Sequence, residues 1–534
     1  MEHSGSNKDA TDETSRKTFA VRNPATGLDI ESYALMDRKD VDRFVAQAHL
    51  RFESWSQTSF SERKKILIRA SQCLADNAGK YAEQIALENG KTKLDALLAD
   101  VFTSVDLIKY LAGHAEKFLK PVKNNPAPLM APFRRWTYIF EPKGVIGIIS
   151  PWNYPFTLSV SPVASALAAG NAVILKPSSQ TTRSGMIVKE IFDTAGLPEN
   201  VLQVLTGTGA LTGQALIEHE GLDMLFFTGS TDTGLQVSAK AAERLIPAIL
   251  ELGGKDVAIV TKNADLDRAA HGVAWGSFTN AGQTCTGTEI ILIDRTVYEP
   301  FMEKFLPLVR ALKLGKGVGD VGSMTVKSQR QIVTQQLEDA LRKGAKAVYS
   351  GQVLPGSQGL WSAPTLLTDV TPDMDVFREE TFGPLKSIIA YDTLEEAVRL
   401  ANSIRYGLSG CVFTRDMDEG QWVARRLQVG SVNINDSLLT YAVPALPFGG
   451  RKQSGLGFYH GEMGLRAFTN VKSITSTNTR LKKEFHWYPM LKDTDMILED
   501  LLTLLHSGNV VKRVRACLAL LPKLPRLMRS MFPY

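Results

Sequence analysis

The stretch Gly144-Val-Ile-Gly-Ile-Ile-Ser-Pro-Trp-Asn-Tyr-Pro-Phe156 is an apolar run that ends in a polar and aromatic turn, and it gives the strongest indication of the fold. A second apolar run, Asn171-Ala-Val-Ile-Leu175, follows after a spacer long enough for a helix. Short apolar runs bounded by turn residues are typical of strands buried on both faces. Because strands that alternate with helices form parallel sheets covered on both sides, the stretch predicts an α/β fold.

The same alternation continues toward the C-terminus. Val201–Leu205 and Met224–Phe227 are further candidates for buried strands, so the region 142–252 is expected to form one nucleotide-binding sheet. Beyond Gly254 the alternation restarts, which predicts a second α/β domain. Its expected strands are Val257–Val260, Glu289–Ile293, Leu385–Tyr391 and Gly410–Phe413.

Toward the N-terminus the pattern changes to a hairpin and helices. Residues 19–33 predict a hairpin that turns at Ala25-Thr26-Gly27. Ser59 and Glu62 form a capping box before an apolar run, which predicts the start of a helix. Residues 1–18 are polar and mixed in charge, so we expect a disordered tail and not a targeting signal.

Composition narrows the classes of function. The chain has 534 residues, 44% of them hydrophobic, and can bury at least two cores. Its 61 basic and 56 acidic residues are too evenly balanced for a nucleic-acid partner. No run reaches the roughly 18 to 20 apolar residues of a membrane-spanning helix. The four cysteines lack CxxC or Cys/His spacing, so we expect no disulfide framework, no metal site and a cytoplasmic location.

Several chemically capable side chains lie in turns beside the predicted strands. Cys285, in Gly282-Gln-Thr-Cys285, can project a thiol into a cleft, although a lone cysteine is more often a small buried hydrophobe. Glu251, in Glu251-Leu-Gly-Gly-Lys-Asp256, is expected at the end of an apolar helix. Asn153 and Lys176 each follow a strand, at the edge where open α/β sheets bind ligands.

One glycine-rich turn has the context of a phosphate site. Gly229-Ser-Thr-Asp-Thr-Gly234 directly follows the predicted strand that ends at Phe227. A helix that begins there could hold a pyrophosphate through its backbone N–H groups. The turn does not match GxGxxG, so by itself it has little specificity.

Together these segments resemble the aldehyde dehydrogenase superfamily, from about Phe19 to about Asn478. The resemblance is also carried by Glu379-Glu-Thr-Phe-Gly-Pro384, Tyr406-Gly-Leu-Ser409 and Pro447-Phe-Gly-Gly-Arg-Lys-Gln-Ser-Gly-Leu-Gly457. It implies an aldehyde dehydrogenase-like α/β fold and a homo-oligomer, either dimer or tetramer. The implied parts are a Rossmann-like cofactor domain (19–122 and 142–252), a second α/β catalytic domain (253–465) and a small β oligomerisation arm (123–141 and 466–480).

The resemblance implies oxidation of an aldehyde to a carboxylic acid with NAD or NADP. The Cys285 thiolate would form a thiohemiacetal, whose oxyanion would accept hydrogen bonds from Asn153 and from the Cys285 backbone N–H. After hydride transfer, Glu251 would activate the water that hydrolyses the thioester. The residues implied around the cofactor are Lys176 and Glu380 at the riboses, Gly229 and Ser230 at the pyrophosphate, and Trp152 and Phe382 near the nicotinamide. Ser179 takes the position where strongly NAD-preferring members usually carry Glu, which leaves NADP open.

The resemblance also bears on the substrate, a small-molecule aldehyde. Succinate-semialdehyde enzymes of the family commonly place an Arg six residues before the catalytic Cys, where this chain has Thr279. An apolar aliphatic or aromatic aldehyde therefore fits better than an acidic one. The residues implied to line the substrate tunnel are Tyr154, Phe278, Tyr441, Leu446 and Phe448.

Three other functions were weighed against this one. A succinate-semialdehyde-type dehydrogenase lacks support without the Arg. A CoA-acylating relative would generally lack Glu251, and a non-catalytic binding or structural relative would usually lose Cys285 or Glu251, yet both are present. Absence of NAD(P)H production over a broad aldehyde panel, with cofactor still bound, would favour the non-catalytic alternative.

The C-terminal extension, 481–534, is not explained by the resemblance. From Leu501 to Tyr534 it has six basic residues and no acidic one. A helical projection places Val510, Val514, Cys517, Leu518 and Leu521 on one face, with Pro522 ending the helix. Such a basic amphipathic helix can pack on the protein's own core, on a second subunit, or peripherally on a membrane surface.

Overall fold

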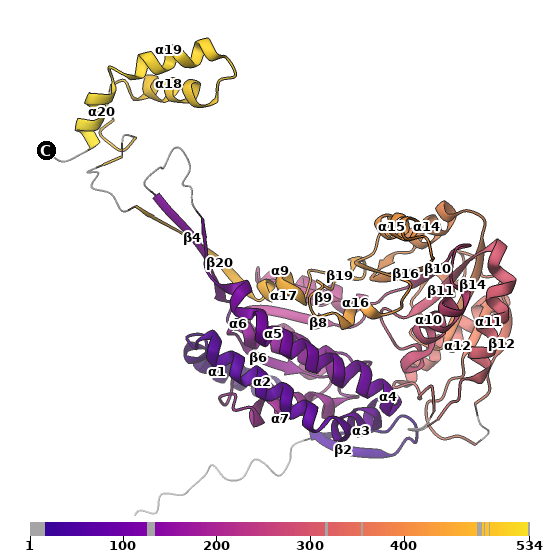
Figure 1. The fold of residues 1–534 in the computed structure, drawn as a ribbon. Helices are drawn as coiled ribbons and strands as arrows, with labels where there is room; N and C mark the ends of the chain where they lie inside the picture. Colours follow the sequence, from indigo (N-terminus) through magenta and orange to yellow (C-terminus); the bar gives the residue numbers. More distant parts are fainter. Residues whose placement is uncertain are drawn as a thin grey trace, which may run out of the picture. The chain divides into compact units, whose positions relative to one another are not determined.

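The computed structural model describes residues 17–124, 134–315, 319–353, 356–477, 483–484, 486–490 and 492–531. The chain divides into two compact units, a large one (1–120 and 140–470) and a small one (121–139 and 471–534). The large unit contains two sheets covered by helices (Figure 1), which confirms the predicted α/β fold class.

A six-stranded sheet lies in the first part of the large unit. All its strand pairs are parallel except the edge pair β19–β9. Side chains alternate along the strands, so that Ile146 enters one core and Val145 enters another on the opposite face. In spatial order the strands are β19 (Gly455–Leu456), β9 (Ala248–Glu251), β8 (Met224–Thr228), β5 (Val145–Ile149), β6 (Ala172–Lys176) and β7 (Leu202–Val204).

Helices cover both faces of this sheet. The parallel strands end at one edge, so the segments that follow them meet there and can form a site. Packed on one face are α2 (Phe60–Asp76), α3 (Ala78–Asn89), α5 (Thr103–Leu119), α6 (Thr157–Ala169), α7 (Thr182–Thr194) and α17 (Gly461–Ala467). On the other are α1 (Arg38–Trp55), α8 (Gln214–Ile217) and α9 (Thr231–Glu243). Between α3 and α5 lie α4 (Lys93–Asp95) and a π-helical segment, Ala96–Phe102.

A seven-stranded sheet forms the second part, parallel except for its antiparallel edge strand β12. Its strands, in spatial order, are β12 (Lys346–Ser350), β13 (Thr365–Thr368), β14 (Leu385–Tyr391), β11 (Thr288–Asp294), β10 (Asp256–Val260), β16 (Ser409–Phe413) and β17 (Ser431–Ile434). Helices α10 (Leu266–Phe278) and α11 (Tyr298–Ala311) cover one face. Helices α12 (Lys327–Arg342), α13 (Asp375–Arg378), α14 (Leu394–Ser403) and α15 (Met417–Arg426) cover the other.

Smaller elements complete the large unit. They are the hairpin β1 (Thr18–Arg22) and β2 (Asp29–Ala34), the ribbon β15 (Tyr406–Gly407) and β18 (Arg451–Lys452), helix α16 (Leu439–Ala442), short helical turns at Gly209–Gly213 and Arg295–Val297, and a 3-10 turn at Thr279–Gly282.

The small unit combines a sheet and helices. Its three-stranded sheet has the order β20 (Thr469–Thr477), β4 (Arg134–Pro142) and β3 (Val122–Asn124), and both β4 and β20 include residues assigned to the large unit. Three helices follow: α18 (Thr494–His506), α19 (Val510–Leu520) and α20 (Leu524–Met531). Helices α18 and α19 pack against each other, and Ile497 and Ala516 are buried.

Most predicted elements match the structure, with three differences. The capping box at Ser59 is present, and its helix begins at Phe60. Glu251 ends strand β9 and not a helix, because the short apolar run pairs in parallel with β8, and periodicity cannot separate such a run from a helix segment. Thr18 already belongs to β1, while residues 1–16 of the predicted tail lie outside the described residues. In the extension the structure adds a helix, α18, that was not predicted.

Candidate active site

The loop that carries Cys285 connects α10 to β11 through an unusual backbone. Asn280, Ala281 and Gly282 all have left-handed φ values, of 51°, 56° and 73°. A Cβ on Gly282 would lie 2.3 Å from the Gly383 carbonyl oxygen, so only glycine fits there. Three consecutive residues in the left-handed backbone region cost conformational free energy, so the surrounding contacts must hold them in place.

Glu251 is the last residue of β9, and the turn that follows it lies beside the loop of Cys285. Its side chain is buried, and Oε1 has no hydrogen-bond partner among the described residues. The following turn lies against the cysteine, since a Cβ on Gly254 would be 2.3 Å from the Cys285 carbonyl oxygen. Burial raises the pKa of Glu251 well above its usual range. Burial also raises the pKa of the Cys285 thiol, with smaller contributions from nearby carboxylates including Glu251.

Asn153 lies in the turn that follows β5 and is buried. Its side-chain amide donates a 3.1 Å hydrogen bond to the carbonyl of Gln283, two residues before the cysteine. This bond uses one amide N–H and fixes the plane of the group. The second N–H has no acceptor among the described residues, so it can donate to a substrate oxygen.

The residues predicted at the riboses and pyrophosphate follow the carboxyl ends of strands. Lys176 ends β6, its Nζ donates to the Pro177 carbonyl at 3.1 Å, and burial lowers its pKa to about 8. Ser179 follows in the next turn and is half-buried. Gly229 follows β8, and Ser230 caps the N-terminus of α9 by accepting a bond from Thr233 N–H. An anion can bind at such a helix start.

Glu380 and Phe382 reach this region from a loop of the second sheet. Glu380 accepts a 2.8 Å bond from Gly254 N–H, and burial raises its pKa to about 8. The Phe382 ring meets Trp152 edge-on, with centroids 5.4 Å apart. Phe382 has a left-handed φ of 48° and donates its N–H to Glu289 at 2.7 Å.

A cavity of about 380 Å³ is lined in part by Cys285, and its wall is mainly apolar. Tyr154 and Tyr441, two of the residues expected at the substrate tunnel, line this cavity, and so does Thr279. Exposed apolar side chains, such as Phe102 and Trp275, lie at its rim. Three carboxylates, Asp95, Asp106 and Asp436, also line it, but no lysine or arginine does among the described residues.

Three of the predicted tunnel residues are placed differently. Phe278 is buried in the core between α10 and the second sheet, and Phe448 packs against Tyr441 behind the cavity wall. Leu446 is 44% exposed. None of the three is among the described residues that line the cavity. The resemblance placed these three residues at the substrate tunnel by their position along the chain. The direction in which each side chain points depends on packing that the sequence does not show.

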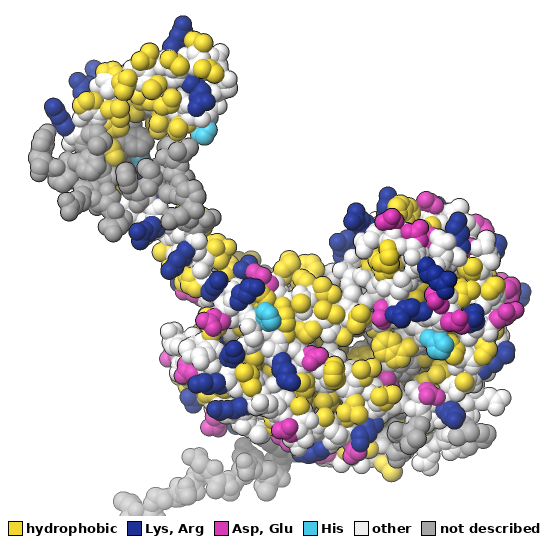
Figure 2. Space-filling model, viewed as in Figure 1, with side chains coloured by type: hydrophobic (Ala, Val, Ile, Leu, Met, Phe, Trp, Pro, Cys, Tyr) yellow, Lys and Arg dark blue, Asp and Glu magenta, His cyan; other side chains and the backbone are white. Residues whose placement is uncertain are grey.

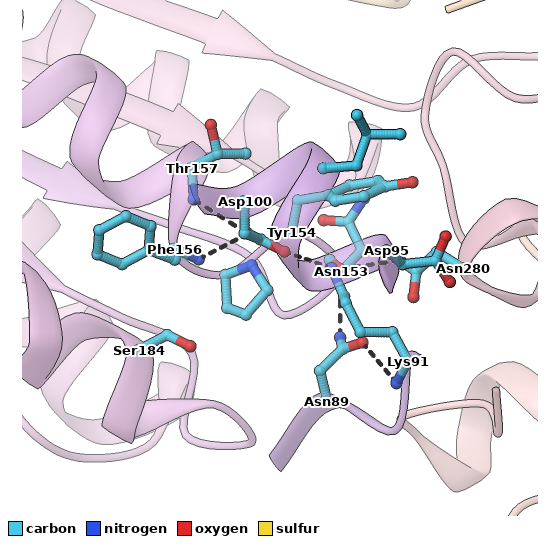
Figure 3. A network of polar contacts seen from close by, with 12 residues as sticks. Asn89, Lys91, Asp95, Asp100, Asn153, Tyr154, Phe156, Thr157, Ser184 and Asn280 are labelled. Carbon is cyan, nitrogen blue, oxygen red and sulfur yellow. Dashed lines mark hydrogen bonds and ion pairs between the residues drawn. The ribbon is translucent and has the colours of Figure 1, made fainter. Parts of the chain in front are cut away.

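Sequence reasoning overlooked two polar groups that hold the site together. Glu289 accepts bonds from Lys255 Nζ at 2.6 Å and from the backbone N–H groups of Thr381 and Phe382, and it thereby fixes the loop of Glu380. The second group is Glu88-Asn-Gly-Lys-Thr92, in which Asn89 bonds to the Asn153 turn (Figure 3). Its signal in the sequence was a run of polar and charged residues at the end of an amphipathic helix.

Comparison with known proteins agrees with this geometry. The sequence model of the "Aldehyde dehydrogenase family" matches residues 10–474. The "4,4'-diapolycopene aldehyde oxidase" of Methylomonas sp is 39% identical over 82% of this chain and 81% of that protein. A Mycobacterium ulcerans (strain Agy99) protein named "Putative succinate-semialdehyde dehydrogenase", with NADP(+) in its name, is 35% identical over 87% and 90% of the two chains.

A solved structure of an NAD-dependent aldehyde dehydrogenase from Sinorhizobium meliloti superposes with a TM-score of 0.84. It is 32% identical, and the match covers 88% of this chain and 93% of that one. The predicted family, fold class, enzyme class and nicotinamide cofactor are confirmed by these matches. The chain belongs to the aldehyde dehydrogenase family and is an NAD(P)-dependent oxidoreductase.

Proposed function

We propose that the enzyme oxidises an apolar aldehyde to its carboxylic acid, by a thioester on Cys285 that water hydrolyses. The observation that carries this proposal is the cavity at Cys285, whose wall is mainly apolar and lacks basic side chains among the described residues. A carboxylate on the substrate would meet Asp95, Asp106 and Asp436 there, without a cation to offset them.

The first chemical step belongs to Cys285 and Asn153. The ionised Glu251 carboxylate takes the thiol proton and passes it to solvent, and the sulfur forms a bond to the aldehyde carbon, so that the carbonyl oxygen becomes an oxyanion. The second N–H of the Asn153 amide and the Cys285 backbone N–H stabilise this oxyanion by donating to it. When bound, NAD or NADP supplies the acceptor for the hydride that leaves the carbon. A thioester then remains on Cys285.

Glu251 carries the second step. Its buried carboxylate has an oxygen without a partner among the described residues, and the turn after it lies against Cys285. The ionised carboxylate takes a proton from water as the water oxygen attacks the thioester carbon. The carbon–sulfur bond breaks, the acid leaves and the thiolate is restored. A CoA-acylating enzyme would have no need of this carboxylate.

The residues at the strand ends fit a nicotinamide dinucleotide. The Lys176 amine and the Glu380 carboxylate would bind ribose hydroxyls, and the start of α9 at Gly229 and Ser230 would bind the pyrophosphate. Trp152 and Phe382 would orient the nicotinamide ring. Ser179 brings no carboxylate to repel a 2′-phosphate, so we propose that the enzyme accepts NADP as well as NAD.

Two relatives suggest different substrates, and the cavity favours one of them. The name of the Methylomonas relative refers to a diapolycopene aldehyde, and that of the mycobacterial relative to succinate semialdehyde. In this chain the Thr279 hydroxyl donates to Asp95 at 2.8 Å, so that the cavity wall presents an acid where a semialdehyde would need a cation. We therefore propose long, apolar aldehydes as the substrate class.

A chain-length series tests the substrate proposal. We expect kcat/KM to rise from propanal to decanal by about 3-fold to 4-fold per added methylene until the cavity is filled, because each buried methylene contributes about 0.8 kcal/mol. Succinate semialdehyde should be at least about 100-fold poorer than hexanal, since its charge would be buried without a partner. A preference for the semialdehyde would contradict the proposal and favour the second relative's substrate.

We also propose that the enzyme is a homo-oligomer that assembles through the three-stranded sheet of the small unit. Strand β20 lies at the edge of this sheet and is exposed along nearly all its length, with Val471 62% exposed. Such an edge can pair with a second copy. Light scattering should give a dimer or tetramer, and Val471→Pro should shift it toward monomer; a monomeric wild-type enzyme would contradict this.

Finally, we propose that the extension binds the surface of an anionic membrane. Several large apolar residues of α19 are exposed: Val510 is 70% exposed, Val514 54% and Leu518 62%. Lys512 and Arg515 lie on the same short helix. In Figure 2, hydrophobic side chains and Lys or Arg side chains lie beside one another on the extension. An exposed apolar face with basic neighbours suits anionic headgroups, where each Lys or Arg contributes about 1 kcal/mol.

No helix of the described residues is long and apolar enough to cross a membrane, so attachment would be peripheral. Four free cysteines fit a cytoplasmic enzyme of this kind. We expect co-sedimentation with vesicles of phosphatidylglycerol and phosphatidylcholine at low salt, and loss of it in Lys512→Glu/Arg513→Glu/Arg515→Glu. The matched control, Lys39→Glu/Lys64→Glu/Lys65→Glu on the large unit, should still bind. Equal loss in both variants, or no binding by wild type, would contradict the proposal.

A further inference from the structure

Five buried polar side chains pack around the predicted oxyanion site and form what we name the amide cluster. Each is 5% exposed or less, and no two of them are adjacent in sequence (Figure 3 shows three of them). They come from four separate segments: the end of α3, the turn after β5, the loop before Cys285, and the segment before α12. The members are Asn89, Asn153, Asn280, Gln283 and Thr325.

Asn89 connects the other segments of the cluster. Its amide donates to the Trp152 carbonyl at 2.6 Å and lies 3.2 Å from the Asn153 carbonyl and from the Thr325 hydroxyl. The Thr325 hydroxyl in turn donates to the Asn89 backbone carbonyl at 2.6 Å. The end of α3 packs closely on the segment before α12, because a Cβ on Gly90 would lie 2.3 Å from Ser323 Oγ and the Ser323 N–H donates to the Gly90 carbonyl at 3.0 Å. Asn89 therefore connects the Asn153 turn to this packed segment.

The loop before the cysteine holds the same turn from the other side. The Asn280 amide donates to the Asn153 carbonyl at 2.9 Å, while the Asn153 amide donates to the Gln283 carbonyl at 3.1 Å. Gln283 is itself fixed, since its Oε1 accepts from Thr325 N–H at 2.9 Å. The Asn153 carbonyl thus receives two amide donors, from Asn89 and Asn280. This pattern fixes both the backbone and the side-chain plane of Asn153.

We infer that Asn89 is a positioning residue, which acts on the reaction through Asn153 and does not touch the substrate. The inference rests on the proposed role of Asn153 as an oxyanion donor. A donor works only when it is aimed at the place where charge develops, and a displacement of about 1 Å can cost about 100-fold in rate. Without its amide, the Trp152 and Asn153 carbonyls lose a donor and the turn is free to shift.

A double-mutant cycle tests this inference in the full-length enzyme. We expect Asn153→Ala to lower the single-turnover rate of NAD(P)H formation from propanal by about 100-fold or more. Asn89→Ala should lower it by about 10-fold or more, with an unchanged KM for the cofactor. Asn89→Ala should cause no further loss in the Asn153→Ala background, because there is then no amide left to position. Losses that multiply in the double mutant, or no loss from Asn89→Ala, would overturn the inference.

A matched control separates positioning from stability. Asn171 is also fully buried, and its amide donates to the Ala166 and Phe468 carbonyls at the opposite end of the sheet. Asn171→Ala should lower the Tm as much as Asn89→Ala does, with the rate per folded enzyme unchanged. If Asn89→Ala does not fold, Thr325→Val removes the hydroxyl that holds Asn89 and should show the same non-additivity with Asn153→Ala. If Asn153→Ala itself loses nothing, the proposed role of Asn153 fails and the inference falls with it.

Discussion

The strands of the second sheet and the helices of the extension use the same apolar residue types in opposite ways. On β11, Ile291, Leu292 and Ile293 are fully buried between two layers of helices. On α19, Val510 and Leu518 are 70% and 62% exposed. Burial of apolar surface is the main stabilising contribution to folding, and the helices obtain little of it. The comparison teaches that apolar side chains stabilise the sheet of the large unit by burial, while those on α19 remain exposed and fit the proposed role in membrane binding.

The largest effect should come from Cys285, and it should be confined to the large unit. We expect Cys285→Ser to lower turnover by about 1,000-fold or more, since a hydroxyl is a far weaker nucleophile than a thiolate. Cofactor binding and vesicle binding should stay as in wild type. Retention of more than about a tenth of the activity would contradict the assignment of the nucleophile. Loss of vesicle binding would break the separation between the two regions.

Glu251 should show the next largest effect. Glu251→Gln keeps the shape but cannot accept a proton, so we expect steady turnover to fall about 100-fold. Acylation should be less affected, so NAD(P)H should appear in a burst followed by a slow phase, with an acyl-enzyme visible by mass spectrometry. Turnover without a burst and without this loss would show that another base serves.

Two matched Leu→Ala substitutions measure how much an apolar side chain of each region contributes to the free energy of unfolding. Leu292→Ala should lower the free energy of unfolding by about 2 to 5 kcal/mol, because it leaves a cavity in a packed core. Leu518→Ala should change it by less than about 0.5 kcal/mol, as is usual for exposed positions, yet weaken vesicle binding. Chemical denaturation of both variants gives the two values. A large loss from Leu518→Ala would show that α19 is part of a core after all.

The pH dependence of thioester hydrolysis should follow from the buried carboxyl of Glu251. Burial raises the pKa of Glu251, and the carboxyl must lose its proton before it can act as a base. The rate of thioester hydrolysis should therefore rise with pH, by up to about 10-fold per unit below that pKa, and fall on acidification. Glu251→Gln should lose this slope. A wild-type rate that is flat between pH 6 and 9 would contradict it.

The smallest effect concerns the cofactor preference. Ser179→Glu should raise the KM for NADP by about 10-fold and change that for NAD much less, since only NADP brings a 2′-phosphate. Initial rates with both cofactors measure this. Equal changes would place Ser179 away from the adenosine ribose.

The fold and the chemical residues were predictable to different degrees. Strands such as Leu385–Tyr391 were predicted to the residue, because an apolar run buried on both faces leaves a strong local pattern. Glu251 was predicted to end a helix, because its short run becomes a strand only through pairing with β8. Asn89 was missed entirely, since its side-chain partners lie in two distant segments, the turn at Trp152 and Asn153 and the segment of Thr325. The inward direction of Phe278 likewise follows from packing.

The short connection Leu252–Lys255 joins β9 of one sheet to β10 of the other, and it begins directly after Glu251. Gly253 packs on the Glu380 carboxylate and Gly254 on the Cys285 carbonyl, so a side chain at either position would push these groups apart. A substitution at either glycine would therefore disturb the proposed base and the loop of the nucleophile together, so this four-residue connection sets the spacing of two groups that belong to different sheets.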